Sequence, residues 1–390
     1  MPRPRPPADR CAELLPGYLS EVRSQVVGVI RELLTPEPAR EHASILYDLM
    51  LDYPLREAKG LRPALCVASC RALGGELEAV LASAAVIELY HNAFLVHDDL
   101  EDRSQVRRGA PTLHVAHGPA IAVNVGDGML ALTLGPLLTN IERIGLGPAL
   151  RVLEAMGEMA TRTVEGQAIE LDWIRRGTWA LSDADYVDMV VRKTGWYSFI
   201  TPVRCGAYCA SAPDQLRATL EAFARELAIA FQIQDDVLSL EGSLDEFGKD
   251  PRGDLWEGKR TLILLHALRT TSPELRARAQ AILAKPVVEA PLAATAKLLD
   301  TLASAGRLDA EARAQIEATL GLEAGRSEAE VDELAAIIDA QRSCDHARSV
   351  ARRHIERARD RLEACDHALA DSTHRDLLWG LVDFVLERRW

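Results

Sequence analysis

The sequence predicts an all-α protein, and three features of its pattern support this fold class. Segments rich in Ala, Leu, Glu and Arg, such as 79–98 and 216–238, carry apolar residues three and four positions apart, which is the spacing of a helix face. Alternating β-branched residues, which would indicate strands, are nearly absent, and aromatic residues make up only 5% of the chain. Gly and Pro cluster between the helical segments, in GAPT, HGPA, SAPD and TSPE. We therefore expect many helices packed into one domain that spans residues 15–390.

The N-terminal segment differs from the rest of the chain in composition. Residues 1–14 begin with MPRPRPPADR, which is rich in proline and lacks the apolar core of a signal peptide. We expect this segment to form a flexible arm.

The cysteines indicate reduced, buried side chains and not a disulfide framework. There are seven of them with no C-x-x-C pair, and Cys66/Cys70 and Cys205/Cys209 are each spaced to share one helix face. Small buried thiols of this kind fit a cytoplasmic protein.

The charge of the chain argues against two classes of partner. A formal net charge of -13 disfavours nucleic acid, which needs a basic face, and weakly disfavours an anionic membrane surface. The most apolar run, 119–138, is interrupted by Asp127, so no stretch offers about 20 uncharged apolar residues. We expect a soluble protein without stable membrane insertion and without a nucleic-acid partner.

The first cluster of acids follows a segment that should be central in the bundle. Segment 79–98 is apolar nearly all round, and Asp98, Asp99 and Asp102 lie at its C-terminal end. Asp98 and Asp102 share a helix face, where they repel each other and meet the unfavourable end of the helix dipole. A divalent cation would offset both costs, and oxygen ligands of this kind suit Mg²⁺.

A second acidic pair, Asp235 and Asp236, ends the apolar segment 216–238. The two clusters could be unrelated acidic helix ends. If instead they face each other across the bundle, they form a carboxylate site for two or three Mg²⁺ ions.

Basic residues at predicted helix ends and loops complete this pattern. One rim of the bundle could collect Lys59, Arg62, Arg107, Arg108, Lys193, Lys249 and Lys259. Magnesium between carboxylates, together with such cations, indicates a site for diphosphates.

With these motifs the chain resembles the trans-isoprenyl diphosphate synthases, or polyprenyl synthetases. The resemblance rests on the ordered set KGLRP, ELYHNAFLVHDDLEDRSQVRRGAPTLH, GD at 126–127, GQAIEL, KTG, FQIQDDVLSL and GKDPRGDLWEGKRTL, over about residues 55–270. It implies an all-α, isoprenoid synthase-type helical bundle with a deep central cavity, usually a homodimer. It also implies that Mg²⁺ helps an allylic diphosphate to ionise, and that the double bond of isopentenyl diphosphate attacks the resulting cation.

The resemblance also implies a role for each matching residue. Asp98 and Asp102 would hold metal with Asp99 in support, and Asp235 would hold metal with Asp236 behind it. The remaining expected roles are these: Arg107, Lys193, Lys249 and Lys259 at the allylic diphosphate; Lys59, Arg62, His91 and Arg108 at isopentenyl diphosphate; Thr194 and Gln232 at the reacting centre; and Gln167 with Glu170 as the family's Gln-and-acid pair.

Two departures from the family pattern keep alternatives open. Ser239 stands where the second cluster usually has a third aspartate, and AKGLRP stands where Gly-Lys-Arg is common. A terpene cyclase of the same fold is one alternative, although it would need no isopentenyl site. A catalytically weak partner subunit is another, although the first acidic cluster is complete. His91 alone could be a core histidine, and we expect His97 and His114 to be structural.

The product length should depend on the side chains below Asp98 on its helix. Phe94 and Tyr90 lie one and two turns below, while Ala93 should leave the neighbouring track open. The resemblance implies a short-chain product. We expect geranylgeranyl diphosphate, with farnesyl diphosphate as the alternative, and Tyr90 as a candidate floor of the site.

Overall fold

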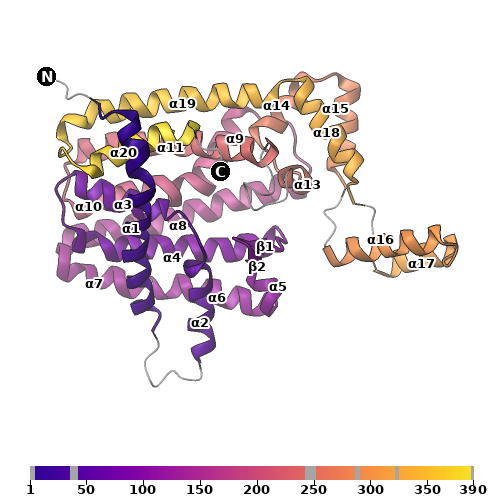
Figure 1. Ribbon diagram of the computed structural model, residues 1–390, viewed down its shortest axis with the longest axis horizontal. Helices are drawn as coiled ribbons and strands as arrows, with labels where there is room; N and C mark the ends of the chain where they lie inside the picture. The colour runs from indigo at the N-terminus through magenta and orange to yellow at the C-terminus, as the bar shows by residue number, and fades with distance from the viewer. Residues whose placement is uncertain (1–4, 36–42, 242–251, 286–289, 321–324, 388–390) are drawn as a thin grey trace.

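The chain folds into the expected all-α bundle, shown in Figure 1. The computed structural model describes residues 5–35, 43–241, 252–285, 290–320 and 325–387. The N-terminal half contains α1 (Ala8–Leu33), α2 (Ser44–Leu55), α3 (Leu61–Ala72), α4 (Leu77–Glu101), α5 (Leu113–His117), α6 (Pro119–Leu132), α7 (Leu134–Ile144) and α8 (Leu146–Arg175). The middle contains α9 (Asp183–Val190), the π-helix η2 (Val191–Ile200), α10 (Thr201–Cys209), α11 (Asp214–Glu241), α13 (Gly253–Glu257), α14 (Leu262–Thr270) and α15 (Pro273–Leu283). The C-terminal part contains α16 (Ala290–Ser304), α17 (Ala310–Leu320), α18 (Glu328–Ala340), α19 (Ser343–Cys365), the 3₁₀ turn η3 (Asp366–Ala368) and α20 (Thr373–Glu387).

Within the described residues, the strands are limited to one short antiparallel ribbon. It pairs β1 (Val106–Arg107) with β2 (Ala110–Pro111) and follows α4 directly. The ribbon matters for function because it carries two of the predicted cationic residues, Arg107 and Arg108.

The predicted central helix is confirmed as α4. It packs against α1, α3, α6, α7 and α10, and most of its side chains are buried, as its apolar circumference requires. Its C-terminal acids therefore project from the middle of the bundle and not from its surface.

Helix α10 packs so closely on α3 that only glycine fits at the contact. A Cβ atom added to Gly206 would lie 2.4 Å from the carbonyl oxygen of Cys66. Close packing also encloses the thiols of Cys66, Cys70, Cys205 and Cys209, which are free and buried. The prediction of reduced, buried cysteines is confirmed, and burial raises the pKa of the Cys70 thiol to about 12.

A long irregular helix is built from α9, η2 and α10 in direct succession. Ser182 begins it with a reciprocal capping box to Asp185, and Pro202 follows the π-helical turns. Proline has no N–H to donate to the preceding turn, which favours irregular helix geometry there. The π-helical segment carries Lys193 and Thr194, and π-helical turns are common at functional sites.

The predicted boundary of the N-terminal arm is too late. Helix α1 begins at Ala8, and Cys11 is buried against Gly380 of α20. Arg5 also forms an ion pair with Asp383 of α20. Arg10 pairs with Asp376 of the same helix, so residues 5–14 contact α20 through ion pairs and the buried Cys11. Residues 1–4 lie outside the described residues.

Helices α16 and α17 pair with each other beside the main bundle, at the right of Figure 1. This pair lies far in space from the ends of α4 and α11, where the predicted site falls. The expectation of a single domain over residues 15–390 stays a prediction.

Two segments are long and apolar enough to cross a membrane by length and composition alone. One is α4, with 67% of its apolar window buried, and the other is Pro119–Ile144, with 33% buried. The first is the central helix of the bundle. The expectation that the chain does not insert into membranes stays a prediction.

Candidate active site

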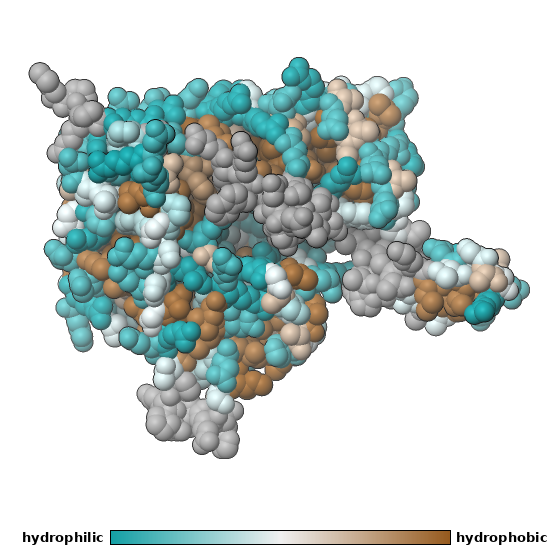
Figure 2. Space-filling view, viewed as in Figure 1, coloured by the Kyte–Doolittle hydropathy of each residue, from teal (hydrophilic) through white to brown (hydrophobic). Residues whose placement is uncertain are grey.

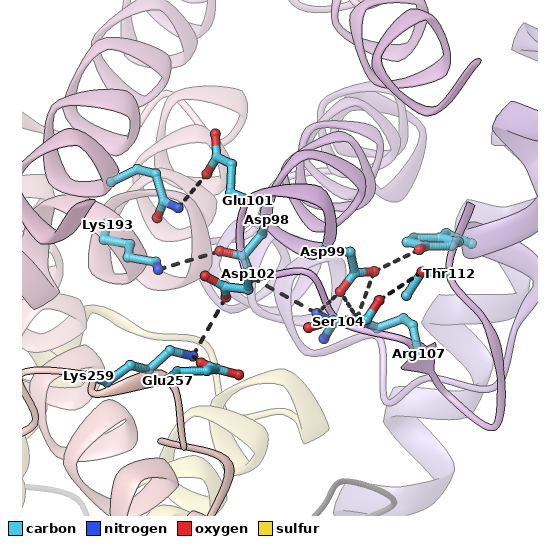
Figure 3. A network of polar contacts seen from close by, with 12 residues as sticks. Asp98, Asp99, Glu101, Asp102, Ser104, Arg107, Thr112, Lys193, Glu257 and Lys259 are labelled. Atoms are coloured by element: carbon cyan, nitrogen blue, oxygen red, sulfur yellow. Dashed lines mark hydrogen bonds and ion pairs between the residues drawn. The ribbon is translucent and has the colours of Figure 1, made fainter. Parts of the chain in front are cut away.

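The first acidic cluster projects two carboxylates toward two lysines, as Figure 3 shows. The Asp98 carboxylate lies 3.4 Å from the Lys193 ammonium, and the Asp102 carboxylate lies 3.7 Å from the Lys259 ammonium. Asp98 lies in the last turn of α4, and Asp102 caps its end, so the two side chains share a face as predicted. The structure therefore brings both predicted lysines to the first acidic cluster.

Asp99 points to the other side of the helix and has a different role from Asp98. Its side chain is fully buried, accepts a hydrogen bond from the Tyr53 hydroxyl at 2.6 Å, and accepts another from Arg107 Nε at 2.9 Å. Both Asp99 oxygens accept hydrogen bonds within the fold, so the expected role of Asp99 in support of the metal-binding residues stays a prediction. Asp99 holds Arg107, whose guanidinium lies 3.9 Å from Asp98.

Both lysines are half-buried and lie among more than one carboxylate. Glu170 of α8 forms an ion pair with Lys193, and Glu257 lies 2.8 Å from Lys259. Burial lowers the pKa of each ammonium, but these carboxylates raise it more, so both lysines stay charged. Both residues of the Gln-and-acid pair therefore have a partner: Glu170 pairs with Lys193, and Gln167 donates a hydrogen bond to Glu101.

The second acidic pair repeats the arrangement of the first. Asp236 is buried and accepts hydrogen bonds from the Tyr186 hydroxyl at 2.6 Å and from Gln232 Nε2 at 2.9 Å. Asp235 is half-buried, one residue before it. In both pairs, the second aspartate binds a buried tyrosine hydroxyl while the first is more exposed. Helix α11 continues to Glu241, so this pair does not end the helix as predicted but lies in its last two turns.

The two acidic clusters meet through the segment that contains α13. Asp254 lies 3.7 Å from Lys259, and burial followed by the charge of Asp254 raises the pKa of Asp236 well above its ordinary value. Burial also raises the pKa of Asp102 to about 7, although Lys259 opposes this. Burial is thus the largest cause of both raised pKa values. Among the described residues, no group of three or more Asp, Glu, His or Cys side chains is spaced to hold a metal ion unaided.

A basic cavity of about 260 Å³ lies beside α4, on the face that also carries Asp98 and Asp102, because His91 is seven residues, or about two helical turns, before Asp98. Its lining includes all four residues that the sequence assigned to isopentenyl diphosphate: Lys59, Arg62, His91 and Arg108. They come from the α2–α3 connection, from α3, from α4 and from the ribbon, so the fold gathers residues up to about 50 positions apart. The prediction that these side chains share one place is confirmed.

Backbone conformation sets two of these residues in position. Gly60 has a φ of 66°, and an added Cβ would lie 2.9 Å from Arg23 Cβ, so glycine is needed before Arg62. Arg108 has a φ of 51°, which is uncommon for a residue with a side chain. Arg108 also donates to the carbonyl oxygen of Tyr53 at 2.9 Å, which fixes the ribbon against α2.

The cavity is strongly cationic. Burial, followed by the charges of Arg62 and Arg108, lowers the pKa of His91 well below its ordinary value, so the imidazole is neutral. Burial also lowers the pKa of Arg108 to about 10. A ligand that brings negative charge would relieve both effects.

One residue of η2, Tyr197, connects the basic cavity to the predicted chain-length residues. Its ring stacks on His91 with centroids 5.7 Å apart and meets Phe94 at 5.6 Å, and the Arg62 guanidinium lies 4.9 Å from its centroid. Phe94 in turn meets Tyr90 at 5.9 Å. These aromatic rings form a continuous wall that begins at the basic cavity.

Ala93 does not leave an open track beside this wall. Its side chain is fully buried and belongs to the hydrophobic core. Adjacent residues of a helix point about 100° apart, so Ala93 faces packed neighbours while Phe94 and Tyr90 stay half-buried. The expectation for Ala93 is therefore wrong.

Several other predicted residues can now be placed. Thr194 is half-buried beside Lys193 on η2. His97 lies 3.5 Å from Asp127, and His114 shares a hydrogen bond with Thr112, which agrees with structural roles. Lys249 lies outside the described residues.

Five residues that contact the acidic clusters or the basic cavity were not predicted from the sequence: Tyr53, Glu88, Tyr186, Tyr197 and Asp254. The sequence does give a signal for Glu88. Between Val80 and Val96 the segment is largely apolar, and Glu88 is its only acidic residue. The tyrosines carry no signal of their own, because their partners are distant in sequence.

The all-α bundle has the fold of the isoprenoid synthases, and the acidic end of its central helix lies beside two lysines and a basic cavity. A sequence profile of the polyprenyl synthetase family matches residues 44–297, so the chain belongs to that family and is a prenyl diphosphate synthase, a transferase.

Similar proteins agree with this assignment. The chain is 34% identical over 226 residues to a short chain isoprenyl diphosphate synthase of Methanocaldococcus jannaschii, which covers 58% of this chain and 67% of that protein. It is 32% identical over 334 residues to a geranylfarnesyl diphosphate synthase of Aeropyrum pernix, which covers 85% of this chain and 90% of that protein. A crystal structure of a geranylgeranyl pyrophosphate synthetase from Pyrococcus horikoshii superposes with a TM-score of 0.76 at 26% identity, over 97% of this chain and 99% of that one.

Proposed function

We propose that this enzyme condenses isopentenyl diphosphate with an allylic diphosphate in a reaction that requires Mg²⁺, and that its product is geranylgeranyl diphosphate. The observation that carries the proposal is the presence of two differently charged places along one face of the α4 C-terminal half. One is the cavity that contains Lys59, Arg62 and Arg108, and the other is the cluster of carboxylates with Lys193 and Lys259. Two diphosphates with different metal requirements fit this division.

The basic cavity suits the diphosphate of isopentenyl diphosphate. Three cationic side chains can bind its oxygens directly, and the arginines offer forked pairs of N–H donors. The neutral His91 offers one further donor. The aromatic wall beside the cavity, formed by Tyr197 and Phe94, is apolar and can hold the isopentenyl group.

The acidic side fits Mg²⁺ by the chemistry of its donors. Asp98, Asp102 and Asp235 supply carboxylate oxygens, which are the ligands that Mg²⁺ prefers. These three residues would hold the metal, with diphosphate oxygens and water completing its ligands. When bound, Mg²⁺ neutralises the diphosphate and stabilises the charge that grows on the leaving group.

Side chains of this enzyme would bind the allylic diphosphate and surround the reacting centre. Lys193 and Arg107 lie close to Asp98 and are charged, so they can contact the departing diphosphate. Glu170 holds Lys193 and Asp99 holds Arg107, which fixes both cations before substrate binds. Thr194 and Gln232 would line the reacting centre, where buried surroundings keep water from the allylic cation.

The aromatic side chains below Asp98 support a short product. Phe94 and Tyr90 are half-buried along α4, and their rings narrow the space beside the helix. We assign Tyr90 as the floor for a tail of about twenty carbons, at two helical turns below Asp98. Farnesyl diphosphate is the alternative if Phe94 is the floor.

An exposed apolar surface supports a homodimer. Figure 2 shows apolar residues gathered on the lower part of the molecule, where α2, α5 and α6 lie in Figure 1. Exposed apolar side chains on α6, α7 and the start of α8 include Ile121, Val123, Leu134, Leu138, Leu146 and Leu150. Sedimentation of the wild type as a monomer at micromolar concentration would contradict this part of the proposal. The free cysteines suit a cytoplasmic enzyme, which cell fractionation can test.

The decisive experiment incubates the protein with isopentenyl diphosphate and each allylic primer in turn, with Mg²⁺, and identifies the product by chain length. We expect geranylgeranyl diphosphate, and we expect EDTA to abolish turnover and Mg²⁺ to restore it. Cyclic hydrocarbons formed from a prenyl diphosphate alone would indicate a terpene cyclase instead. Turnover that appears only after addition of a second synthase chain would indicate a partner subunit.

A further inference from the structure

Glu88 is an acidic residue inside the basic cavity, where a diphosphate would be expected to meet only donors. Its side chain lines the cavity and is only 7% exposed. Oε1 accepts a hydrogen bond from Asn92 Nδ2 at 3.3 Å, but Oε2 has no hydrogen-bond partner in the described part of the chain. A buried carboxylate oxygen without a donor is costly, so this atom is a candidate contact for a ligand.

The charged groups around Glu88 come from four elements. Lys59 lies in the α2–α3 connection, Arg62 lies on α3, Arg108 lies on the ribbon, and Arg23 of α1 also acts on the Glu88 carboxylate. Arg23 is occupied by the carbonyl oxygens of Pro54 and Arg56. The cavity lining itself therefore carries three cations, one carboxylate and the neutral imidazole of His91.

The charge balance of the cavity changes when a diphosphate enters. A diphosphate ester carries two or three negative charges near neutral pH, because its last proton leaves with a pKa of about 6. The fully ionised ester together with the Glu88 carboxylate would bring more negative charge than the three cations can neutralise. The excess would lie between a carboxylate oxygen and a phosphate oxygen in a place of low dielectric.

We propose that the cavity binds isopentenyl diphosphate together with one proton, which is held between Glu88 and an oxygen of the diphosphate. This inference rests on the proposed function of the cavity. The proton turns a repulsive pair of anions into a hydrogen bond, in the way that two carboxylates at one site share a proton. It also gives Glu88 Oε2 the partner that it lacks.

His91 also has a buried nitrogen, Nδ1, without a hydrogen-bond partner in the described residues, and could in principle take the proton. A neutral imidazole, however, already has one N–H that it can donate to a phosphate oxygen. An ionised carboxylate has none. The need for a proton is therefore at Glu88, and burial, opposed by Arg62 and Arg108, already raises the pKa of its carboxyl.

Uptake of a proton makes the affinity for isopentenyl diphosphate fall as the pH rises. The effect applies in one pH range. This range lies above the pKa values of free Glu88 and of the last phosphate proton, and below the pKa of the shared proton in the complex. Within it the dissociation constant should rise about tenfold for each pH unit. Below that range both free groups are already protonated in part, and the dependence should weaken.

The test is isothermal titration of the protein with isopentenyl diphosphate in EDTA, at about pH 8, in Tris and in HEPES. The two buffers differ in ionisation enthalpy, so the difference in measured heat gives the number of protons taken up. We expect about one proton for the wild type and close to none for Glu88→Gln, whose dissociation constant should stay within about twofold between pH 8 and 9. Glu78→Gln is the matched control, because it makes the same change at the exposed start of α4.

The outcomes separate this inference from the proposed function. Binding to the wild type without proton uptake would overturn the inference and leave the proposed function intact, and it needs no variant to fold. Uptake that persists in Glu88→Gln would place the proton on His91 and overturn the role of Glu88. Absence of any binding by the wild type would contradict the proposed function itself.

Discussion

Gly166 of α8 allows the backbone that carries Lys193 to approach the helix, and its replacement should damage the active site. An added Cβ would lie 2.2 Å from Lys193 N, 2.6 Å from Lys193 Cα and 2.8 Å from the carbonyl carbon of Arg192. All three are backbone atoms, so no side-chain rotation can relieve the overlap. Reaching an ordinary contact of 3.4 Å would require α8 and η2 to separate by about 1 Å.

Two effects of Gly166→Ala can be estimated from this displacement. Overpacking in a buried contact costs about 1–3 kcal/mol in the free energy of unfolding, partly offset by the better helix propensity of alanine. A displacement of about 1 Å at a group that contacts the substrate can lower turnover about 100-fold. Lys193 moves with η2 while its partner Glu170 stays on α8, so the loss should appear in kcat and in KM for the allylic diphosphate.

The matched control lies on the same helix. A Cβ at Gly157 would meet nothing within 4 Å, so Gly157→Ala should stabilise the protein by up to about 1 kcal/mol and leave kcat unchanged. Thermal unfolding followed by circular dichroism and steady-state prenyl transfer measure both effects. The reasoning would be refuted if Gly166→Ala matched Gly157→Ala in stability and in turnover.

Two further predictions concern the ribbon and the aromatic wall. Arg56 donates to the carbonyl oxygens of Arg107 at 2.8 Å and of Pro111 at 2.8 Å, so it fixes the ribbon that presents Arg108. Arg56→Ala should raise KM for isopentenyl diphosphate about tenfold with a smaller change in kcat, and Arg56→Lys should rescue only part of this because an ammonium cannot span both carbonyls. Arg71→Ala, which removes a similar bond to Gly75 O at the end of α3, is the control, and an unchanged KM in Arg56→Ala would count against the role of the ribbon. Tyr90→Ala and Phe94→Ala, made separately, should show which ring is the floor, because removal of the floor should lengthen the product at similar total turnover. Products of wild-type length from both variants would mean that the tail runs elsewhere.

The basic cavity could be predicted because its residues belong to motifs that can be recognised one by one. KGLRP, the α4 histidine and the RRG turn each carry a local pattern, and the structure brings Lys59, Arg62, His91 and Arg108 together. The sequence also explains part of the local geometry, because the left-handed backbone conformation before Arg62 favours glycine, which stands at position 60. Motif order predicted this grouping without any knowledge of distances.

Contacts that depend on the orientation of a side chain around its helix could not be predicted from the sequence. Asp98 and Asp99 are adjacent, yet one faces Lys193 and the other faces Tyr53, because successive side chains diverge by about 100°. Ala93 was misjudged for the same reason, since its small size matters only if it faces the site. Glu88 and Tyr197 depend on partners from other elements, and the π-helical turns that place Tyr197 have no sequence signature of their own.

The central claim is that two diphosphates bind at neighbouring places along α4, one by cationic side chains and the other through carboxylates that need Mg²⁺. Isothermal titration with isopentenyl diphosphate and with geranyl diphosphate, each in EDTA and in Mg²⁺, tests this division directly. We predict that isopentenyl diphosphate binds the wild type in EDTA with little change on addition of Mg²⁺, whereas geranyl diphosphate binds only with Mg²⁺. Binding of geranyl diphosphate in EDTA as strongly as in Mg²⁺, or loss of isopentenyl diphosphate binding on chelation, would contradict the account.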